Sequence, residues 1–178
     1  MLTVRVSFRP SEGKTFAVLN HSGSPQLVGI VEKLLASEAE ASRPEKRRQY
    51  QIGPENYKAT VRGTENIGGR ECYIVALMPK MKSRFLVRGY IWVDKTTGDI
   101  VQLDGITAAS VSMWIGHPHV VEECADVDGI CLPKRTTAVS SNLLLGESEL
   151  EIRYTDYQVG SPAEVAAHAD TSARGGRL

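Results

Sequence analysis

The chain has 178 residues, of which 42% are hydrophobic and 24% are charged, a composition typical of a globular protein with one well-filled core. Its 21 Lys and Arg residues equal its 21 Asp and Glu residues in number, so it lacks the basic excess of proteins that bind nucleic acids or lie on membranes through a polybasic patch. No apolar run approaches the roughly 20 residues of a membrane-spanning helix, and we expect neither a nucleic-acid partner nor a membrane-spanning segment.

A β-hairpin is predicted at the start of the chain. Apolar and polar residues alternate over residues 2–8, which is the period of a strand with one buried face. Residues 10–13 contain Pro, Ser and Gly and predict a turn, and residues 15–20 are expected to form the returning strand.

The next segment predicts the main helix of the chain, over about residues 25–42. Ser24 is a suitable N-cap, Pro25 occupies the first helical position, and Pro44 ends the helix. Five apolar residues recur at helical spacing and form one stripe: Leu27, Ile30, Val31, Leu34 and Leu35. This stripe is expected either to pack on a sheet as core or to act as a lid over a ligand cavity.

The remainder of the chain predicts a meander of antiparallel strands. Their expected ranges are 57–67, 70–79, 84–94, 99–107, 119–127, 130–141 and 147–159. Gly68-Gly69 and Asp128-Gly129 are two-residue hairpin signals, because both positions of such turns need a positive φ. With the first hairpin the count is nine strands, a size at which an open sheet must curl or split.

These elements predict a mainly β fold, a curved antiparallel sheet with one amphipathic helix, as a single domain over residues 1–159. Residues 160–178 are rich in Ser, Pro, Ala, Gly and charged side chains, and we expect them to be a disordered tail.

Several of the predicted strands are apolar on both faces, whereas an antiparallel sheet covered on one side shows a cleaner polar face. In the strand expected over residues 84–94, one face carries Phe85, Val87, Ile91 and Val93, and the other carries Leu86, Tyr90 and Trp92. Two interpretations remain open. Either the helix and the curl of the sheet bury both faces, or the concave face is a cavity for an apolar ligand.

No pattern of catalytic or metal-binding residues is recognised. His117 and His119 form the one local histidine pair, and a metal site needs further converging ligands. Motifs of hydrolases, phosphate-binding loops and calcium loops are absent from the sequence, so we expect neither enzymatic activity nor a cofactor.

The three cysteines, Cys72, Cys124 and Cys131, form no disulfide framework. If the chain is periplasmic, Cys124 and Cys131 could pair, because they flank the predicted Asp128-Gly129 turn. A two-residue loop, however, places Cys124 opposite Pro133 and not opposite Cys131. We therefore interpret the cysteines as small, half-buried hydrophobic residues.

Residues 73–80, 84–94 and 98–101, with the segment Gly-Tyr-Ile-Trp-Val-Asp at 89–94, resemble bacterial outer-membrane lipoprotein-sorting proteins. These are the periplasmic LolA/LolB-like carriers, and the lipid-sensing domain of sigma-factor regulators is related to them. The segments Gly129 to Lys134 and Ile152 to Tyr157 extend the likeness, which covers roughly residues 55–159. The resemblance implies an unclosed, half β-barrel whose mouth is plugged by helices and whose cavity takes acyl chains.

The function implied is that of a non-catalytic binding module for a lipid or an acylated protein. The residues expected to line its cavity are Ile74, Met78, Phe85, Val87, Ile91, Val93, Leu103, Trp114 and Leu150, with Leu27, Val31 and Leu34 as the lid. Tyr73, Tyr90 and Trp92 replace them if the other face is concave. The alternative is a sensor or docking domain whose sheet binds a protein partner.

The resemblance also bears on location. The segment Met1 to Val6 contains no basic stretch followed by an apolar one, so no secretory signal is recognised. We expect a periplasmic or cell-envelope protein if a leader precedes these residues, and a cytoplasmic protein otherwise.

Overall fold

The computed structural model describes residues 1–111, 116–142 and 146–160. Within these ranges the chain forms one long helix, one short helix and nine strands. Their bounds in chain order are β1 (Leu2–Arg9), β2 (Gly13–His21), α1 (Pro25–Ser42), α2 (Pro44–Arg47), β3 (Tyr57–Ile67), β4 (Arg70–Pro79), β5 (Val87–Asp94), β6 (Ile100–Thr107), β7 (His119–Val127), β8 (Ile130–Asn142) and β9 (Gly146–Arg153).

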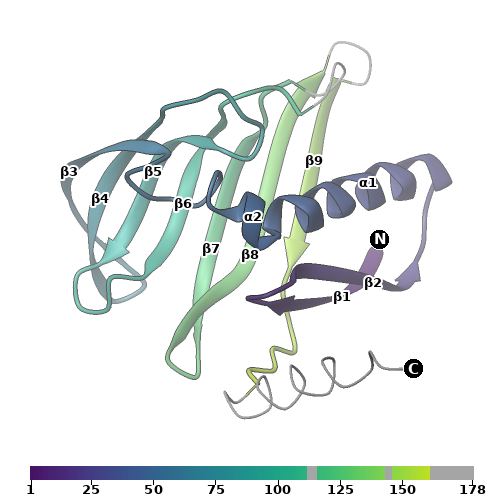
Figure 1. The fold of residues 1–178 in the computed structure, drawn as a ribbon, viewed down its shortest axis with the longest axis horizontal. Coiled ribbons are helices and arrows are strands. Elements are labelled where there is room, and N and C mark those ends of the chain that lie inside the picture. The colour runs from purple at the N-terminus through teal and green to yellow at the C-terminus, as the bar shows by residue number, and fades with distance from the viewer. Residues whose placement is uncertain (112–115, 143–145, 161–178) are drawn as a thin grey trace, which may run out of the picture.

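The strands form two antiparallel sheets (Figure 1). Strands β3 to β9 make a seven-stranded meander in chain order, and β1 and β2 make a separate hairpin. The large sheet ends at β3 and β9, which do not pair with each other, and it is not strongly curled. The predicted antiparallel meander is therefore confirmed. The half-barrel curvature is not seen, because the nine strands divide into two sheets instead of curling as one.

Two tight turns confirm the hairpin signals. Gly68 and Gly69 have φ angles of 58° and 88°, and Asp128 and Gly129 have φ angles of 53° and 79°. Positive φ at both central residues gives a turn whose twist matches that of the flanking strands.

Helix α1 has the bounds that the sequence predicts. It begins at Pro25 and ends at Ser42, and Pro44 then starts the short helix α2. Ser24 does not cap the helix through its side chain and instead bonds to Gln26. The helix lies over the face of the large sheet nearest the viewer in Figure 1 and packs mainly against β2, so the hairpin and the helix cover the same side.

The core lies at the β4–β5 side of that covered face. Its buried residues are Tyr57, Leu77, Leu86 and Ile91. The strand predicted over residues 84–94 begins only at Val87. The residues before it form a turn, in which the Leu86 N–H donates a hydrogen bond to the Ser83 carbonyl at 3.3 Å. This turn carries Leu86 into the core instead of the opposite face, and the Val87 N–H donates to the Tyr57 hydroxyl at 3.1 Å.

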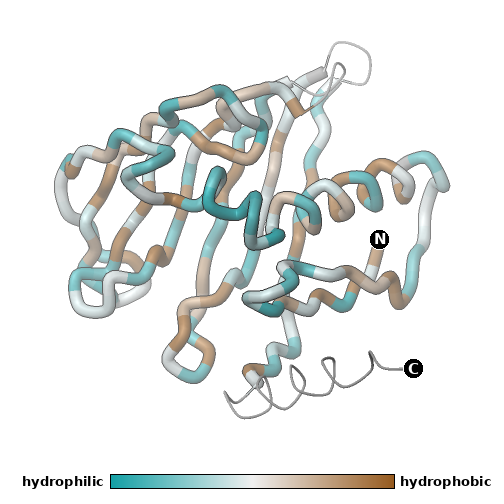
Figure 2. The backbone as a smooth tube through the Cα atoms, in the orientation of Figure 1, coloured by the Kyte–Doolittle hydropathy of each residue, from teal (hydrophilic) through white to brown (hydrophobic). Residues whose placement is uncertain are grey.

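Hydrophobic and hydrophilic residues both occur along the strands, as Figure 2 shows by colour. The last strand is shorter than predicted, since β9 ends at Arg153 and the chain to Gly160 is irregular. The tail expected over residues 160–178 lies outside the described residues from 161 onward. No helix in the described part of the chain is long and apolar enough to cross a membrane.

Candidate functional site

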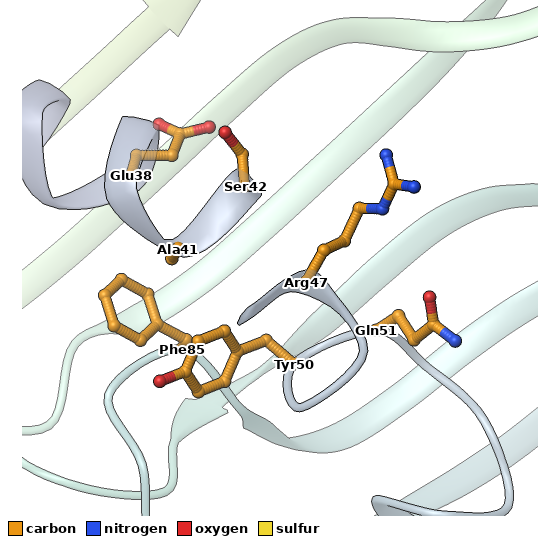
Figure 3. A pocket seen from close by; sticks show the side chains of 7 residues that line it. All are labelled: Glu38, Ala41, Ser42, Arg47, Tyr50, Gln51 and Phe85. Carbon is orange, nitrogen blue, oxygen red and sulfur yellow. The ribbon is translucent and has the colours of Figure 1, made fainter. Parts of the chain in front are cut away.

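An open cavity of about 230 Å³ lies where α1, α2 and the loop before β5 meet (Figure 3). The C-terminal end of α1, the segment around α2 and the loop before β5 each contribute to its lining. The seven lining residues are Glu38, Ala41, Ser42, Arg47, Tyr50, Gln51 and Phe85.

Two aromatic rings and one methyl group form the apolar side of this cavity. The rings of Tyr50 and Phe85 lie 4.8 Å apart at an angle of 47°, and Ala41 stands next to them on α1. The Arg84 guanidinium covers the Phe85 ring at 5.0 Å and donates to Ser37 on α1 at 2.5 Å. The Arg84 side chain therefore holds the loop before β5 against α1.

The rim of the cavity is polar and carries charge of both signs. Glu38 is paired with Lys14 of β2 at 2.5 Å, and the Lys14 N–H donates to the Ser42 hydroxyl at 2.6 Å. Arg47 lies over the Phe8 ring at 5.7 Å, so its guanidinium stands between the first hairpin and the cavity. An apolar wall beside a cationic edge suits an amphipathic ligand with a negatively charged end.

The structure brings part of the predicted lining together. Phe85 lies in the cavity. Ile91 pairs with Leu103 on the covered face of the sheet. Val87 and Val93 point to the same face, because side chains alternate along β5. Val93 and Leu103 pack against the buried core cluster, so these residues serve as core in the structure as it stands.

Two predicted residues lie on the opposite face. Val75, not Ile74, pairs with Ile91, and Ile74 pairs with Trp92 on the uncovered side. Met78 follows Ile74 by four residues and is 52% exposed. The register of β4 against β5 therefore separates Ile74 and Met78 from the cavity side.

Three of the other predicted residues do not line the cavity. Val31 and Leu34 are half-buried and precede Glu38 on one stripe of α1, and Leu150 is half-buried opposite Ala138. Trp114 and the side chain of Leu27 lie outside the described residues.

Sequence reasoning missed Ala41, Arg47 and Tyr50 as cavity residues. Arg47 belongs to the basic run Lys46-Arg47-Arg48, which reads as an ordinary solvated segment. The sequence signal that could have indicated the cavity is Tyr50, an aromatic residue in a charged segment without a strand or helix pattern.

A second cluster of polar side chains lies between α1 and strands β7 to β9. Thr136 donates to the Glu122 carboxylate at 3.1 Å, and the charges of Lys14 and Glu38 act on Glu122 from the helix side. Burial raises the pKa of Glu122, and the Thr136 hydrogen bond and Lys14 offset this only in part. Burial likewise raises the pKa of Tyr154, which interacts with Thr136.

Glu122→Gln is expected to stabilise the protein at neutral pH. Because the pKa of Glu122 is higher in the folded state, folding favours the protonated carboxyl group. The contribution of this group to the free energy of unfolding is therefore fully present below the ordinary pKa of 4.5 and is lost as the pH rises through the folded-state pKa. Each unit of elevation corresponds to about 1.4 kcal/mol. Chemical denaturation should show the variant more stable than the parent at pH 7.5, and the two should converge below pH ~4.

Glu123→Gln is the matched control, because Glu123 is the next residue of β7 and points to the other face. Its effect should stay within about 0.5 kcal/mol. A Glu122→Gln variant that is less stable than the parent at pH 7.5 would contradict the burial of this carboxylate.

The two histidines of the predicted pair have separate partners. His117 Nδ1 is 2.8 Å from the Thr107 carbonyl, and His119 Nε2 is 2.7 Å from the Asp104 carboxylate. Among the residues described by the structure, no three His, Cys, Asp or Glu side chains are grouped so that they could hold a metal ion.

Comparison of the chain with family models, curated proteins and solved structures finds no match.

Proposed function

We propose that this protein is a non-catalytic binding module that holds an acyl chain of a lipid or of an acylated protein in the cavity between α1, α2 and the loop before β5. The observation that carries this proposal is that one cavity has an apolar wall, formed by the rings of Tyr50 and Phe85, and a cationic side chain, Arg47, at its rim. The likeness of the strand segments to lipoprotein-sorting proteins supports it, and such a function places the chain in the periplasm or cell envelope.

The size of the cavity sets the part of the ligand that it holds. Pockets for drug-sized ligands have volumes of about 300–1,000 Å³, and this one has about 230 Å³. It therefore accommodates a section of one acyl chain, with the rest of the ligand in solvent or along the helix. Leu34 and Val31 are half-buried, one turn and two turns before Glu38 on the same stripe, and would extend the apolar path.

Filling the cavity should abolish binding of a fluorescent fatty-acid probe. Ala41→Phe places a ring beside Tyr50 and Phe85 and is expected to weaken probe affinity at least tenfold, because it occupies the space of the acyl chain. The matched control is Ala36→Phe, an exposed position on the same helix, which should leave the affinity unchanged. The denaturation midpoint of both variants shows whether the fold is retained.

The charge of Arg47 separates binding of the acyl chain from binding of its head group. Arg47→Gln should weaken binding of the fatty-acid probe but not that of its uncharged methyl ester. A parent protein that binds neither probe at micromolar concentration, or an Ala41→Phe variant that binds like the parent, would defeat the acyl-chain proposal.

The second candidate function is protein docking, which the uncovered face of the large sheet favours. Met78, Tyr90 and Ile106 are 52%, 47% and 39% exposed on that face, and Trp92 lies beside Tyr90 with ring centroids 6.5 Å apart. The helix and the first hairpin lie on the other side (Figure 1). Exposed aromatic and apolar side chains on one face are typical of protein-interaction surfaces.

A further inference from the structure

Cys124 and Cys131 are neighbours on one face of the β7–β8 hairpin. The register pairs Cys124 with Pro133 and Asp126 with Cys131, so the two cysteines are diagonal neighbours. Asp126 is two residues from Cys124 on β7, so both side chains point to the same face of the sheet. Cys131 of β8 is the direct partner of Asp126 and points to that face as well. Cys131 contributes to the raised pKa of the Cys124 thiol, so the two side chains are close enough to interact electrostatically.

The hairpin can bring the two sulfurs together. The register shifts between Glu123 and Cys124, so that Lys134 is the extra residue of a bulge in β8. A bulge increases the local twist and bends its strand, and the Asp128-Gly129 turn ends the hairpin two residues before Cys131. A diagonal disulfide needs a small backbone adjustment, and a hairpin end with a bulge provides the freedom for it.

A cation from a distant strand reaches the same place. Arg70 stands at the start of β4, which β5 and β6 separate from the β7–β8 hairpin in the sheet. Its guanidinium is nevertheless 3.9 Å from the Cys131 sulfur. The same group is 3.4 Å from Asp126 and 3.8 Å from Asp94, which hold it in position. A guanidinium at this site stabilises negative charge that develops on the sulfur.

The two cysteines differ in environment. Burial raises the pKa of Cys124 to about 12, with further contributions from Cys131 and Glu122. Cys124 therefore keeps its proton at neutral pH, and Cys131 is the thiol available as the first nucleophile. Both residues are partly accessible, whereas Cys72 is fully buried.

We propose that Cys124 and Cys131 form a dithiol site that hydrogen peroxide oxidises to a reversible intramolecular disulfide. The Cys131 thiolate attacks one oxygen of the peroxide, the O–O bond breaks, and a sulfenic acid forms while hydroxide leaves and takes up a proton as water. The Cys124 sulfur then attacks the sulfenic sulfur. An S–S bond forms, and the second hydroxide leaves with the Cys124 proton as water. Overall, two thiols and one peroxide give one disulfide and two waters.

The test is thiol counting on the full chain. Reduced protein treated with peroxide should retain one free thiol of three, measured by maleimide labelling after denaturation. A protease that cleaves before Asp126 and Asp128 separates the two cysteines, so the disulfide should join two peptides in the mass spectrum. Addition of a reductant should restore all three thiols.

Single substitutions then assign the order of reaction. In Cys124→Ser, a sulfenic acid should accumulate on Cys131 and be trapped by dimedone; in Cys131→Ser, Cys124 should stay unmodified over the same time. The control Cys72→Ala should form the disulfide like the parent. Three free thiols after treatment, a disulfide that includes Cys72, or only intermolecular disulfides would overturn the proposal.

Arg70→Gln tests the cation. It should slow disulfide formation several-fold, because the guanidinium beside Cys131 is lost. Arg88→Gln, an exposed arginine in β5, is the matched control and should oxidise at the parent rate. If Arg70→Gln also oxidises at the parent rate, Arg70 has no part in the site.

Discussion

Gly89→Ala is expected to lower the free energy of unfolding by about 3 kcal/mol, at the upper end of the cost of overpacking. Gly89 of β5 pairs with Gly105 of β6, and the two backbones approach closely. A Cβ at position 89 would lie 2.1 Å from the Asp104 carbonyl oxygen and 2.4 Å from the Gly105 Cα. Both neighbours are backbone atoms, so a side-chain rotation cannot relieve the contact and the strand pair must separate.

The control is Gly63→Ala in β3, where an added Cβ would meet nothing within 4 Å. That change removes a flexible residue from a strand and should be neutral or stabilise by up to about 1 kcal/mol. Urea denaturation of both variants gives the comparison. A Gly89→Ala variant within 0.5 kcal/mol of the parent would show that β5 and β6 do not approach as closely as the structure has them.

The hairpins and the helix could be predicted because each depends on local chemistry. Gly68-Gly69 and Asp128-Gly129 demand positive φ, and the structure has it at all four positions. Pro25 and Pro44 delimit a helix wherever they stand in the fold. These signals need no knowledge of which strand lies next to which.

The assignment of strand faces failed because it depends on register. Alternation shows that Ile74 and Val75 point to opposite faces of β4, but it does not show which of them shares a face with Ile91. The register answers this by pairing Val75 with Ile91. A shift of one residue exchanges the two faces, and that shift is fixed by tertiary packing around Leu77 and Tyr57.

The two candidate sites show what a sequence conceals. The cavity joins Ala41 with Phe85, and the dithiol site joins Arg70 with Cys131, contacts between segments that are far apart in the chain. The register of Cys124 against Pro133 was predicted and is confirmed. Its consequence, a diagonal contact with Cys131 beside a cation, follows only when the position of β4 is known.

Leu86→Ala is expected to cost about 2–5 kcal/mol of stability, through lost burial and the cavity left behind. Leu86 is fully buried although it precedes the strand, and it belongs to the cluster with Tyr57, Leu77 and Ile91. The chain on either side of it is held by backbone bonds. The Leu86 carbonyl accepts from the Ala108 N–H at 2.7 Å, and the Val87 N–H donates to the Tyr57 hydroxyl. Such a fixed site cannot collapse easily around the missing atoms, so the cost should lie in the upper half of that range.

Ile106→Ala is the control, because Ile106 lies on the uncovered face of β6 and is 39% exposed. Its truncation removes a comparable number of carbon atoms but leaves no enclosed cavity, and it should cost roughly 1 kcal/mol or less. Thermal and urea denaturation of the two variants separate the effect of core burial from that of strand propensity. Equal losses would mean that the uncovered face is as well packed as the core. That result would also remove the exposed surface on which the docking alternative depends, while the cavity beside Phe85 would be unaffected.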